Sequence, residues 1–84
     1  MIRTLVLGAS LNRTRYAHLA IRRLQRQNFW VVGIGSREGR VGGTSIYNEK
    51  ILLKNIHTVS VYLNPKNQEE YYKYVVELNP VRVI

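Results

Sequence analysis

The chain contains no cysteine among its 84 residues. Disulfides, thiolate metal sites and cysteine nucleophiles are therefore excluded. No apolar run approaches the roughly 20 residues of a membrane-spanning helix. The short apolar stretch at the N-terminus leads directly into a glycine turn and an arginine-rich segment, which is not the pattern of a signal peptide. We therefore expect one small cytoplasmic domain over residues 1–84 and no association with a membrane.

Acidic residues are scarce, with 5 against 13 lysines and arginines, so the formal net charge is +8. Such an excess predicts attraction to polyanions, which include nucleic acid, an acidic membrane surface and a multiply phosphorylated small molecule. Charge alone does not separate these partners. For Arg22, Arg23 and Arg26 the alternative is a solvated basic face that only keeps the protein in solution.

The segment from Leu5 to Leu24 predicts a buried strand, a turn of small residues and an amphipathic helix rich in arginine. The strand covers residues 2–7 and the helix residues 14–27, with Asn12 or Thr14 as the N-terminal cap. Ala17 and Ile21 recur at helical spacing and are expected to face the sheet. His18 is expected on the exposed side of the helix.

A strand that ends at a glycine before a helix N-terminus can bind an anion, because the first N–H groups of a helix lack internal partners. The small residues Gly8, Ala9 and Ser10 would let a phosphate approach the backbone. Ser10 and Asn12 could add hydrogen bonds, and Arg15 could add charge. The alternative is a tight turn that needs glycine for its geometry and binds nothing.

The remaining pattern alternates strands and helices, which predicts an α/β fold with a parallel sheet. The expected elements are a strand over 29–34, a glycine-rich loop over 35–43, an edge strand over 44–47, up to two helical turns over 49–55, a strand over 57–63, a helix from about 65 to 78 and a strand over 81–84. For the later helix, either Asn64 with Pro65 at the first helical position or a capping box of Asn67 and Glu70 marks the start.

In such sheets the ligand crevice lies beyond the carboxyl ends of the strands, where the strand order reverses. The turns at 8–15 and 64–67 are therefore expected to flank one crevice, with the loop at 35–43 beside it. Ser36 and Arg37 in that loop are the second expected ligand contact, and a solvent-exposed glycine loop without a ligand is the alternative. This convergence favours a phosphorylated ligand.

Three stretches, LVLGAS…RYAHLAIRRL, VVGIGSREGRVGGTSIY and TVSVYLNPKNQEEYYKYVVELNPVRVI, resemble the small bacterial CoA-binding proteins. Those proteins are related to the CoA-binding domain of succinyl-CoA synthetase. The resemblance covers essentially the whole chain. It implies a Rossmann-like, doubly wound, mainly parallel sheet of about four to five strands with helices on both faces. Relatives continue beyond the last strand with a motif that begins Asn-Pro-Gly, so the resemblance also implies a truncated version of the family fold.

The resemblance implies that the chain binds coenzyme A or an acyl-CoA without catalysing a reaction. By position, the turn of Gly8, Ala9 and Ser10 would hold the CoA phosphates, with help from Asn12 and Arg15. Ser36 and Arg37 would reach the nucleotide end of the ligand, and Asn64 and Pro65 would form the opposite lip. One departure is Ala17, where the family often has a serine.

Two other functions fit parts of the sequence. An NAD-type dinucleotide module is disfavoured because the first turn lacks the G-x-G-x-x-G pattern. A basic nucleic-acid-binding protein would bind with a steep salt dependence and little preference for CoA. No paired carboxylates or metal-ligand cluster indicate an enzyme or a metal site. The strand at 81–84, if uncovered, would allow pairing with a second copy of the chain.

Overall fold

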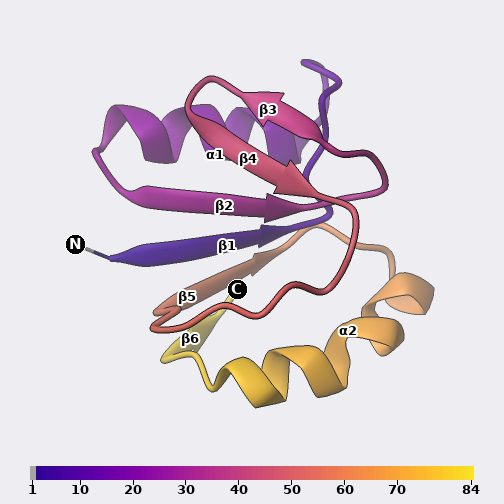
Figure 1. The fold of residues 1–84 in the computed structure, drawn as a ribbon. Coiled ribbons are helices and arrows are strands. Elements are labelled where there is room, and N and C mark those ends of the chain that lie inside the picture. The colour runs from indigo at the N-terminus through magenta and orange to yellow at the C-terminus, as the bar shows by residue number, and fades with distance from the viewer. Residues whose placement is uncertain (1) are drawn as a thin grey trace.

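The computed structural model describes residues 2–84 as one twisted sheet between two helices (Figure 1). The strand order is β3-β4-β2-β1-β5-β6, and every neighbouring pair is parallel except β3 and β4. The elements are β1 (Arg3–Leu7), α1 (Tyr16–Arg26), β2 (Trp30–Ile34), β3 (Gly39–Val41), β4 (Thr44–Tyr47), β5 (Thr58–Val61), α2 (Pro65–Leu78) and β6 (Arg82–Val83).

This arrangement confirms the α/β, mainly parallel, doubly wound fold, with α1 and α2 on opposite faces of the sheet (Figure 1). The expected number of four to five strands is too low, since the sheet has six. The additional strand is β3, which lies in the segment over 35–43 that the sequence predicted as a glycine-rich loop. Gly42 turns the chain with a φ of 58°, and β3 then pairs antiparallel with β4.

β1 lies at the centre of the sheet, between β2 and β5. Successive side chains of a strand point to opposite faces, and both faces of β1 are buried. Leu5 and Leu7 belong to the core on the α2 side, and Val6 belongs to the core on the α1 side. A central parallel strand that is covered on both faces needs this nearly continuous apolar run.

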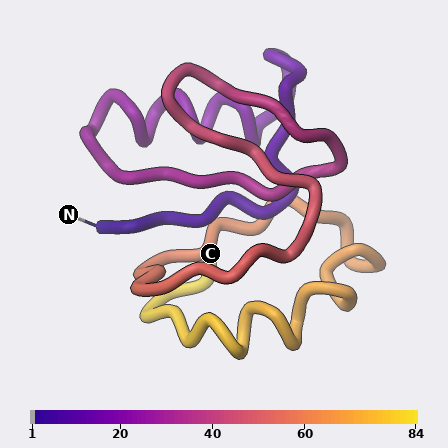
Figure 2. Tube along the Cα trace, viewed as in Figure 1, coloured from indigo at the N-terminus to yellow at the C-terminus, as the bar shows by residue number. Residues whose placement is uncertain are grey.

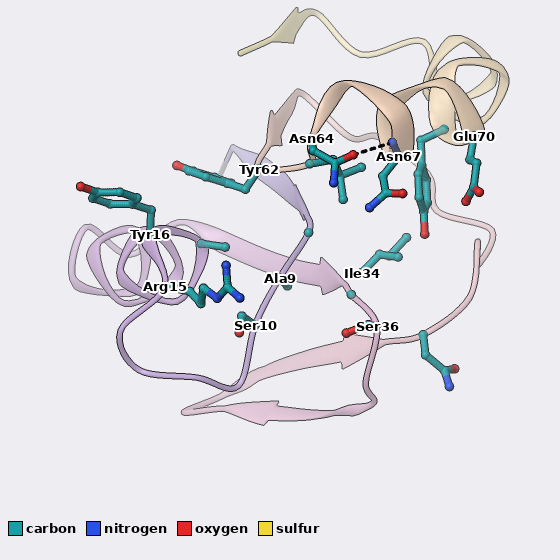
Figure 3. A pocket seen from close by; sticks show the side chains of 16 residues that line it. Ala9, Ser10, Arg15, Tyr16, Ile34, Ser36, Tyr62, Asn64, Asn67 and Glu70 are labelled. Carbon is teal, nitrogen blue, oxygen red and sulfur yellow. Dashed lines mark hydrogen bonds between the residues drawn. The ribbon is translucent and has the colours of Figure 1, made fainter.

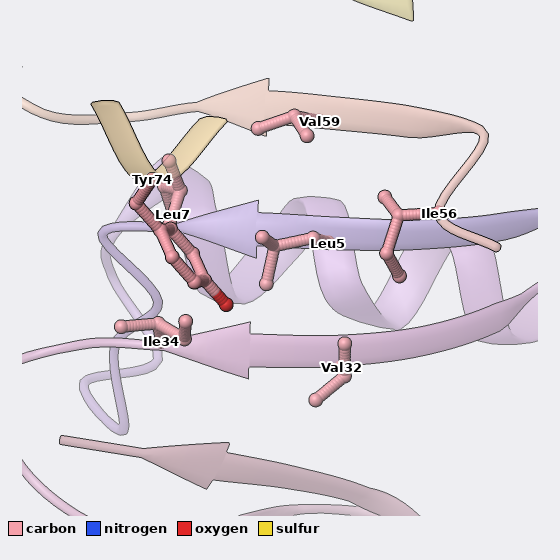
Figure 4. Packing of buried hydrophobic residues seen from close by; sticks show 7 residues of the cluster. All are labelled: Leu5, Leu7, Val32, Ile34, Ile56, Val59 and Tyr74. Carbon is pink, nitrogen blue, oxygen red and sulfur yellow. The ribbon is translucent and has the colours of Figure 1, made fainter. Parts of the chain in front are cut away.

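The two cores are built from different elements. On the α1 side, Ala17 and Ile21 of the helix pack with apolar residues of β1, β2, β3 and β4. On the other side, Tyr74 of α2 packs with residues of β1, β2 and β5 (Figure 4), namely Leu5, Leu7, Val32, Ile34 and Val59, together with Ile56. Tyr71, Val75 and Leu78 of α2 are partly buried against this second core.

The helix expected over 49–55 is absent, and these residues form an extended strap instead. Figure 2 shows this segment running from the end of β4 back to the start of β5, on the side of the sheet that α2 covers. Ile51 and Leu53 pack against the core, whereas Leu52 between them is 99% exposed. The apolar residues therefore follow a period of two, which is the period of an extended chain and not of a helix.

The edge formed by β6 is short, and both of its residues are exposed. The expectation that this edge pairs with a second copy of the chain stays a prediction. Across residues 2–84, neither helix has the length and apolar character needed to cross a membrane.

Tyr74 joins the strap to α2. Its ring is 9% exposed, and its hydroxyl donates a hydrogen bond of 2.7 Å to the carbonyl oxygen of Ile51. Burial, and to a smaller extent the neighbouring Tyr71, raises the pKa of Tyr74 above its ordinary value of 10.0. The hydroxyl therefore stays protonated and able to donate at neutral pH.

We expect Tyr74→Phe to lower the free energy of unfolding by about 1–2 kcal/mol, because the partly buried Ile51 carbonyl loses its donor. Urea denaturation monitored by circular dichroism measures this difference. The matched control is Tyr72→Phe, since Tyr72 lies on the same helix and is 62% exposed. Equal stability of the wild type and Tyr74→Phe would show that this hydrogen bond does not hold the strap.

Candidate functional site

The carboxyl ends of β1 and β5 lie side by side at the point where the strand order of the sheet reverses. β1 leads through α1 to β2 on one side, and β5 leads through α2 to β6 on the other. The two crossovers lie on opposite faces, so a crevice opens between the strand ends. A cavity of about 650 Å³ lies there (Figure 3). Its volume is in the range of small-molecule sites.

The turn after β1 is closed by backbone contacts with both neighbouring strands. The N–H groups of Gly8 and Ala9 both donate to the carbonyl oxygen of Ile34, at 2.8 and 3.0 Å. Gly8 has a φ of +82°, and a Cβ there would lie 2.7 Å from the carbonyl oxygen of Tyr62. Gly8 is therefore needed for the geometry of the turn. Its N–H group and that of Ala9 are not free for a phosphate, contrary to the expectation from the sequence.

Two glycines allow the turn to pack this closely against β2: Gly33 lies in the strand, and Gly35 directly follows it. A Cβ on Gly33 would lie 2.8 Å from the Cβ of Ala9, and a Cβ on Gly35 would collide with the carbonyl oxygen of Ala9. The first glycine turn thus depends on glycines that lie 25 residues or more further along the chain. These glycines hold the floor of the cavity in place.

The N-terminus of α1 is open. Arg15 is the N-cap residue and makes no side-chain hydrogen bond there, so neither Asn12 nor Thr14 caps the helix as expected. Among the described residues, the N–H groups of Tyr16, Ala17 and His18 have no hydrogen-bond partner. Arg15, Tyr16 and Ala17 all line the cavity. Free N–H groups and the helix dipole make this end of the cavity suited to an anion.

His18 is 6% exposed, so its expected place on the surface is wrong. Its Nδ1 lies 3.0 Å from the carbonyl oxygen of Ser10. A carbonyl only accepts hydrogen bonds, so Nδ1 carries the proton. Because α1 begins at Tyr16, His18 lies in the first helical turn and faces back toward the preceding loop. The imidazole therefore fixes the open helix end relative to Ser10 on the floor of the cavity.

The N-terminus of α2 is largely capped by the protein itself, and of the N–H groups described in its first turn only that of Lys66 has no partner. The side chain of Asn64 accepts a hydrogen bond of 2.9 Å from the N–H of Asn67, and Pro65 at the first helical position has no N–H to offer. The carbonyl oxygen of Asn64 accepts from the N–H of Gln68. This confirms Asn64 with Pro65 as the start of the helix and excludes the capping box of Asn67 and Glu70. The two strand-to-helix junctions therefore differ in the number of free donors.

The structure brings most of the predicted site residues together. The cavity is lined by Gly8, Ala9, Ser10, Arg15, Ser36 and Asn64. Asn12, Arg37 and Pro65 are not among the lining residues. The Asn12 side chain instead accepts hydrogen bonds from the backbone N–H and the hydroxyl of Thr14, which fold the loop before α1. Arg37 is exposed in the bend before β3.

Several side chains of the cavity wall were not predicted as site residues from the sequence: Tyr16, Asn48, Tyr62, Asn67, Glu70 and Tyr71. Two of them carried a usable signal. Tyr62 directly follows β5, and Asn48 directly follows β4, so both lie at the carboxyl end of a parallel strand. Glu70 and Tyr71 reach the cavity through the packing of α2, which the local sequence does not show.

The charges that line the cavity lie on its two helices. Arg15 at the start of α1 is the only cationic lining residue that the structure describes, and Glu70 of α2 is the only anionic one. The other lining residues are polar or apolar and neutral. The cavity therefore offers positive potential at α1 and an acceptor on α2, so an anionic group of a ligand is favoured at the α1 end.

Comparison with known proteins finds a matching family and solved structures of the same fold. The family model described as a CoA binding domain matches residues 3–84. One solved structure, of an uncharacterized protein, is 40% identical with a TM-score of 0.93 and is matched over 99% of this chain and 69% of its own. Searching the curated proteins found no match.

Two more distant structures share the fold. A conserved hypothetical protein from Pyrococcus furiosus is 22% identical with a TM-score of 0.82, matched over 93% of this chain and 68% of its own. A hypothetical protein from Pyrococcus horikoshii is 20% identical with a TM-score of 0.79, matched over 92% of this chain and 55% of its own. The match to the family model, which spans nearly the whole chain, shows that this protein belongs to the CoA-binding domain family.

Proposed function

We propose that the protein binds coenzyme A or an acyl-CoA in the cavity between β1 and β5 and catalyses no reaction on it. The observation that carries this proposal is the open N-terminus of α1, with Arg15, on a cavity in a chain that matches the CoA binding domain. The protein would act in the cytoplasm.

The charge distribution of CoA suits a cavity that is positive at the α1 end and negative at the α2 end. CoA carries about four negative charges on its diphosphate and 3′-phosphate, which guanidinium groups and helix N-termini recognise. We place the diphosphate at the free N–H groups of Tyr16 and Ala17 and at Arg15. We place the uncharged pantetheine arm toward α2, where Pro65 has no N–H, the N–H of Asn67 is already bonded to Asn64, and Glu70 would repel a phosphate.

The lining also favours binding over catalysis. Among the described residues it contains no histidine, and Glu70 is its only carboxylate. The nearby His18 uses Nδ1 on the carbonyl oxygen of Ser10 and not on the Ser10 hydroxyl, which itself accepts from the N–H of Asn12. A serine without an adjacent general base is a poor nucleophile.

We expect Arg15→Ala to weaken CoA binding by roughly 10-fold or more, since a charge-assisted hydrogen bond typically contributes 1.5–3 kcal/mol. Isothermal titration calorimetry measures the dissociation constant. Arg26→Ala is the matched control. This substitution removes the same charge from the last turn of the same helix, and Arg26 does not line the cavity. A larger loss for Arg26→Ala than for Arg15→Ala would place the site elsewhere.

A ligand panel at two salt concentrations separates the proposed function from its alternatives. CoA should bind more tightly than NAD, and the affinity for CoA should depend less on salt than the affinity for a short DNA duplex. Binding of a duplex by a basic protein falls steeply as salt rises. Calorimetry with each ligand at low and physiological salt provides the comparison. If CoA and the duplex bind equally well and lose affinity in parallel with salt, the protein is a general polyanion binder.

A further inference from the structure

Three tyrosines line the cavity, and two of them have free aromatic faces. Tyr71 already uses its ring within the protein, since the ammonium group of Lys50 lies 5.1 Å from the ring centroid and the ring meets Tyr74 edge-on at 6.3 Å. Tyr16 and Tyr62 have no such aromatic or cationic contact among the described residues. They are 81% and 42% exposed. Core packing therefore explains Tyr71 but does not explain Tyr16 or Tyr62.

The two free tyrosines lie on the same side of the cavity, next to the open helix end. In the view of Figure 3 both side chains lie toward Arg15 and away from Glu70. Tyr16 is the first residue of α1 and follows Arg15 directly. Tyr62 is held against the turn after β1, because its N–H donates to the carbonyl oxygen of Leu7 at 2.9 Å and its own carbonyl packs on Gly8. Both rings are thus attached to the elements that form the anion-binding end.

We propose that Tyr16 and Tyr62 form a stacking surface for the purine base of the bound nucleotide. This inference rests on the proposed function and adds the position of the base within the site. In a nucleotide the base is one ribose away from the first phosphate, so a diphosphate at Arg15 and the α1 N–H groups brings the base near these rings. A base presents a flat apolar face, and stacking on an aromatic side chain is favourable for any base.

The other candidate for the base is the segment after β2, to which the family resemblance assigned the nucleotide end. There the cavity is lined by Ile34, Gly35 and Ser36, and Arg37 is not among the lining residues. Ile34 is 1% exposed and belongs to the core. This segment therefore offers no aromatic or guanidinium face on which a base could stack. The free aromatic area lies only at Tyr16 and Tyr62 within the part of the cavity that the structure describes.

The test compares two halves of the ligand. The probes are ADP, which carries the base and the diphosphate, and 4′-phosphopantetheine, which carries a phosphate and no base. The double variant Tyr16→Leu/Tyr62→Leu should weaken ADP and CoA at least about fivefold, because loss of one base–aromatic stack typically costs a factor of about 5 to 100. Affinity for 4′-phosphopantetheine should stay within about twofold. The conservative double variant Tyr16→Phe/Tyr62→Phe should bind ADP like the wild type.

Tyr72→Leu is the matched control, since Tyr72 is exposed but does not line this cavity. Circular dichroism confirms that each variant folds, and an NMR cross-relaxation signal between adenine and tyrosine ring protons in the wild type reads the contact directly. If CoA binds and the leucine variant retains full affinity for ADP, the base lies elsewhere and this inference fails alone. An equal loss for 4′-phosphopantetheine would assign the rings to the pantetheine arm. If the wild type binds neither CoA nor ADP, the proposed function fails as well.

Discussion

The site depends on how the end of β1 is held between its two neighbours. The N–H groups of Gly8 and Ala9 bond to the carbonyl oxygen of Ile34 in β2, and the N–H of Tyr62 beyond β5 bonds to the carbonyl oxygen of Leu7. The chain therefore leaves the sheet at a fixed point and in a fixed direction. Only a left-handed glycine fits there, because any Cβ on Gly8 would strike the backbone of Tyr62. The position of α1, and with it the open helix end, follows from this turn.

A consequence is that the glycine turn positions the candidate anion site without contributing N–H donors to it. Its own N–H groups are consumed in holding the strands together, so the free donors are those of the first turn of α1. His18 connects the two parts through the carbonyl oxygen of Ser10. The corresponding junction after β5 is capped by Asn64, which leaves the cavity with one end rich in donors and one end that is neutral or acidic. This difference gives a ligand with one phosphorylated end a preferred direction.

Much of the fold was predictable from the sequence, because the features that set it are local. The apolar runs of β1, β2 and β5, the helical spacing of α1 and α2, and the Asn64-Pro65 start were all visible in the pattern. The place of the site was predictable too, since the carboxyl ends of parallel strands meet at one edge of a sheet. Gly8, Ser10, Arg15 and Asn64 line the same cavity as a result.

The predictions from the sequence were wrong where contacts between distant parts of the chain determine the local structure. The strap over 49–55 is extended because Ile51 bonds to Tyr74 and Leu53 packs against the core, and these distant contacts override the local pattern. His18 is buried because the loop before α1 folds back over it and brings the carbonyl oxygen of Ser10 to its Nδ1. The pairing of the Gly8 and Ala9 N–H groups with Ile34 joins segments about 25 residues apart, and no local pattern announces such a bond.

Under the proposed function the N-terminus of α1, and not that of α2, receives the anionic part of the ligand. The most direct measurement is a titration of ¹⁵N-labelled protein with CoA, followed by the backbone amide signals at physiological salt. We expect large shifts for Ser10, Tyr16 and Ala17, and small shifts for Lys66 and Asn67 at the N-terminus of α2. Large shifts at Lys66 and Asn67 with unchanged signals at Tyr16 and Ala17 would contradict it.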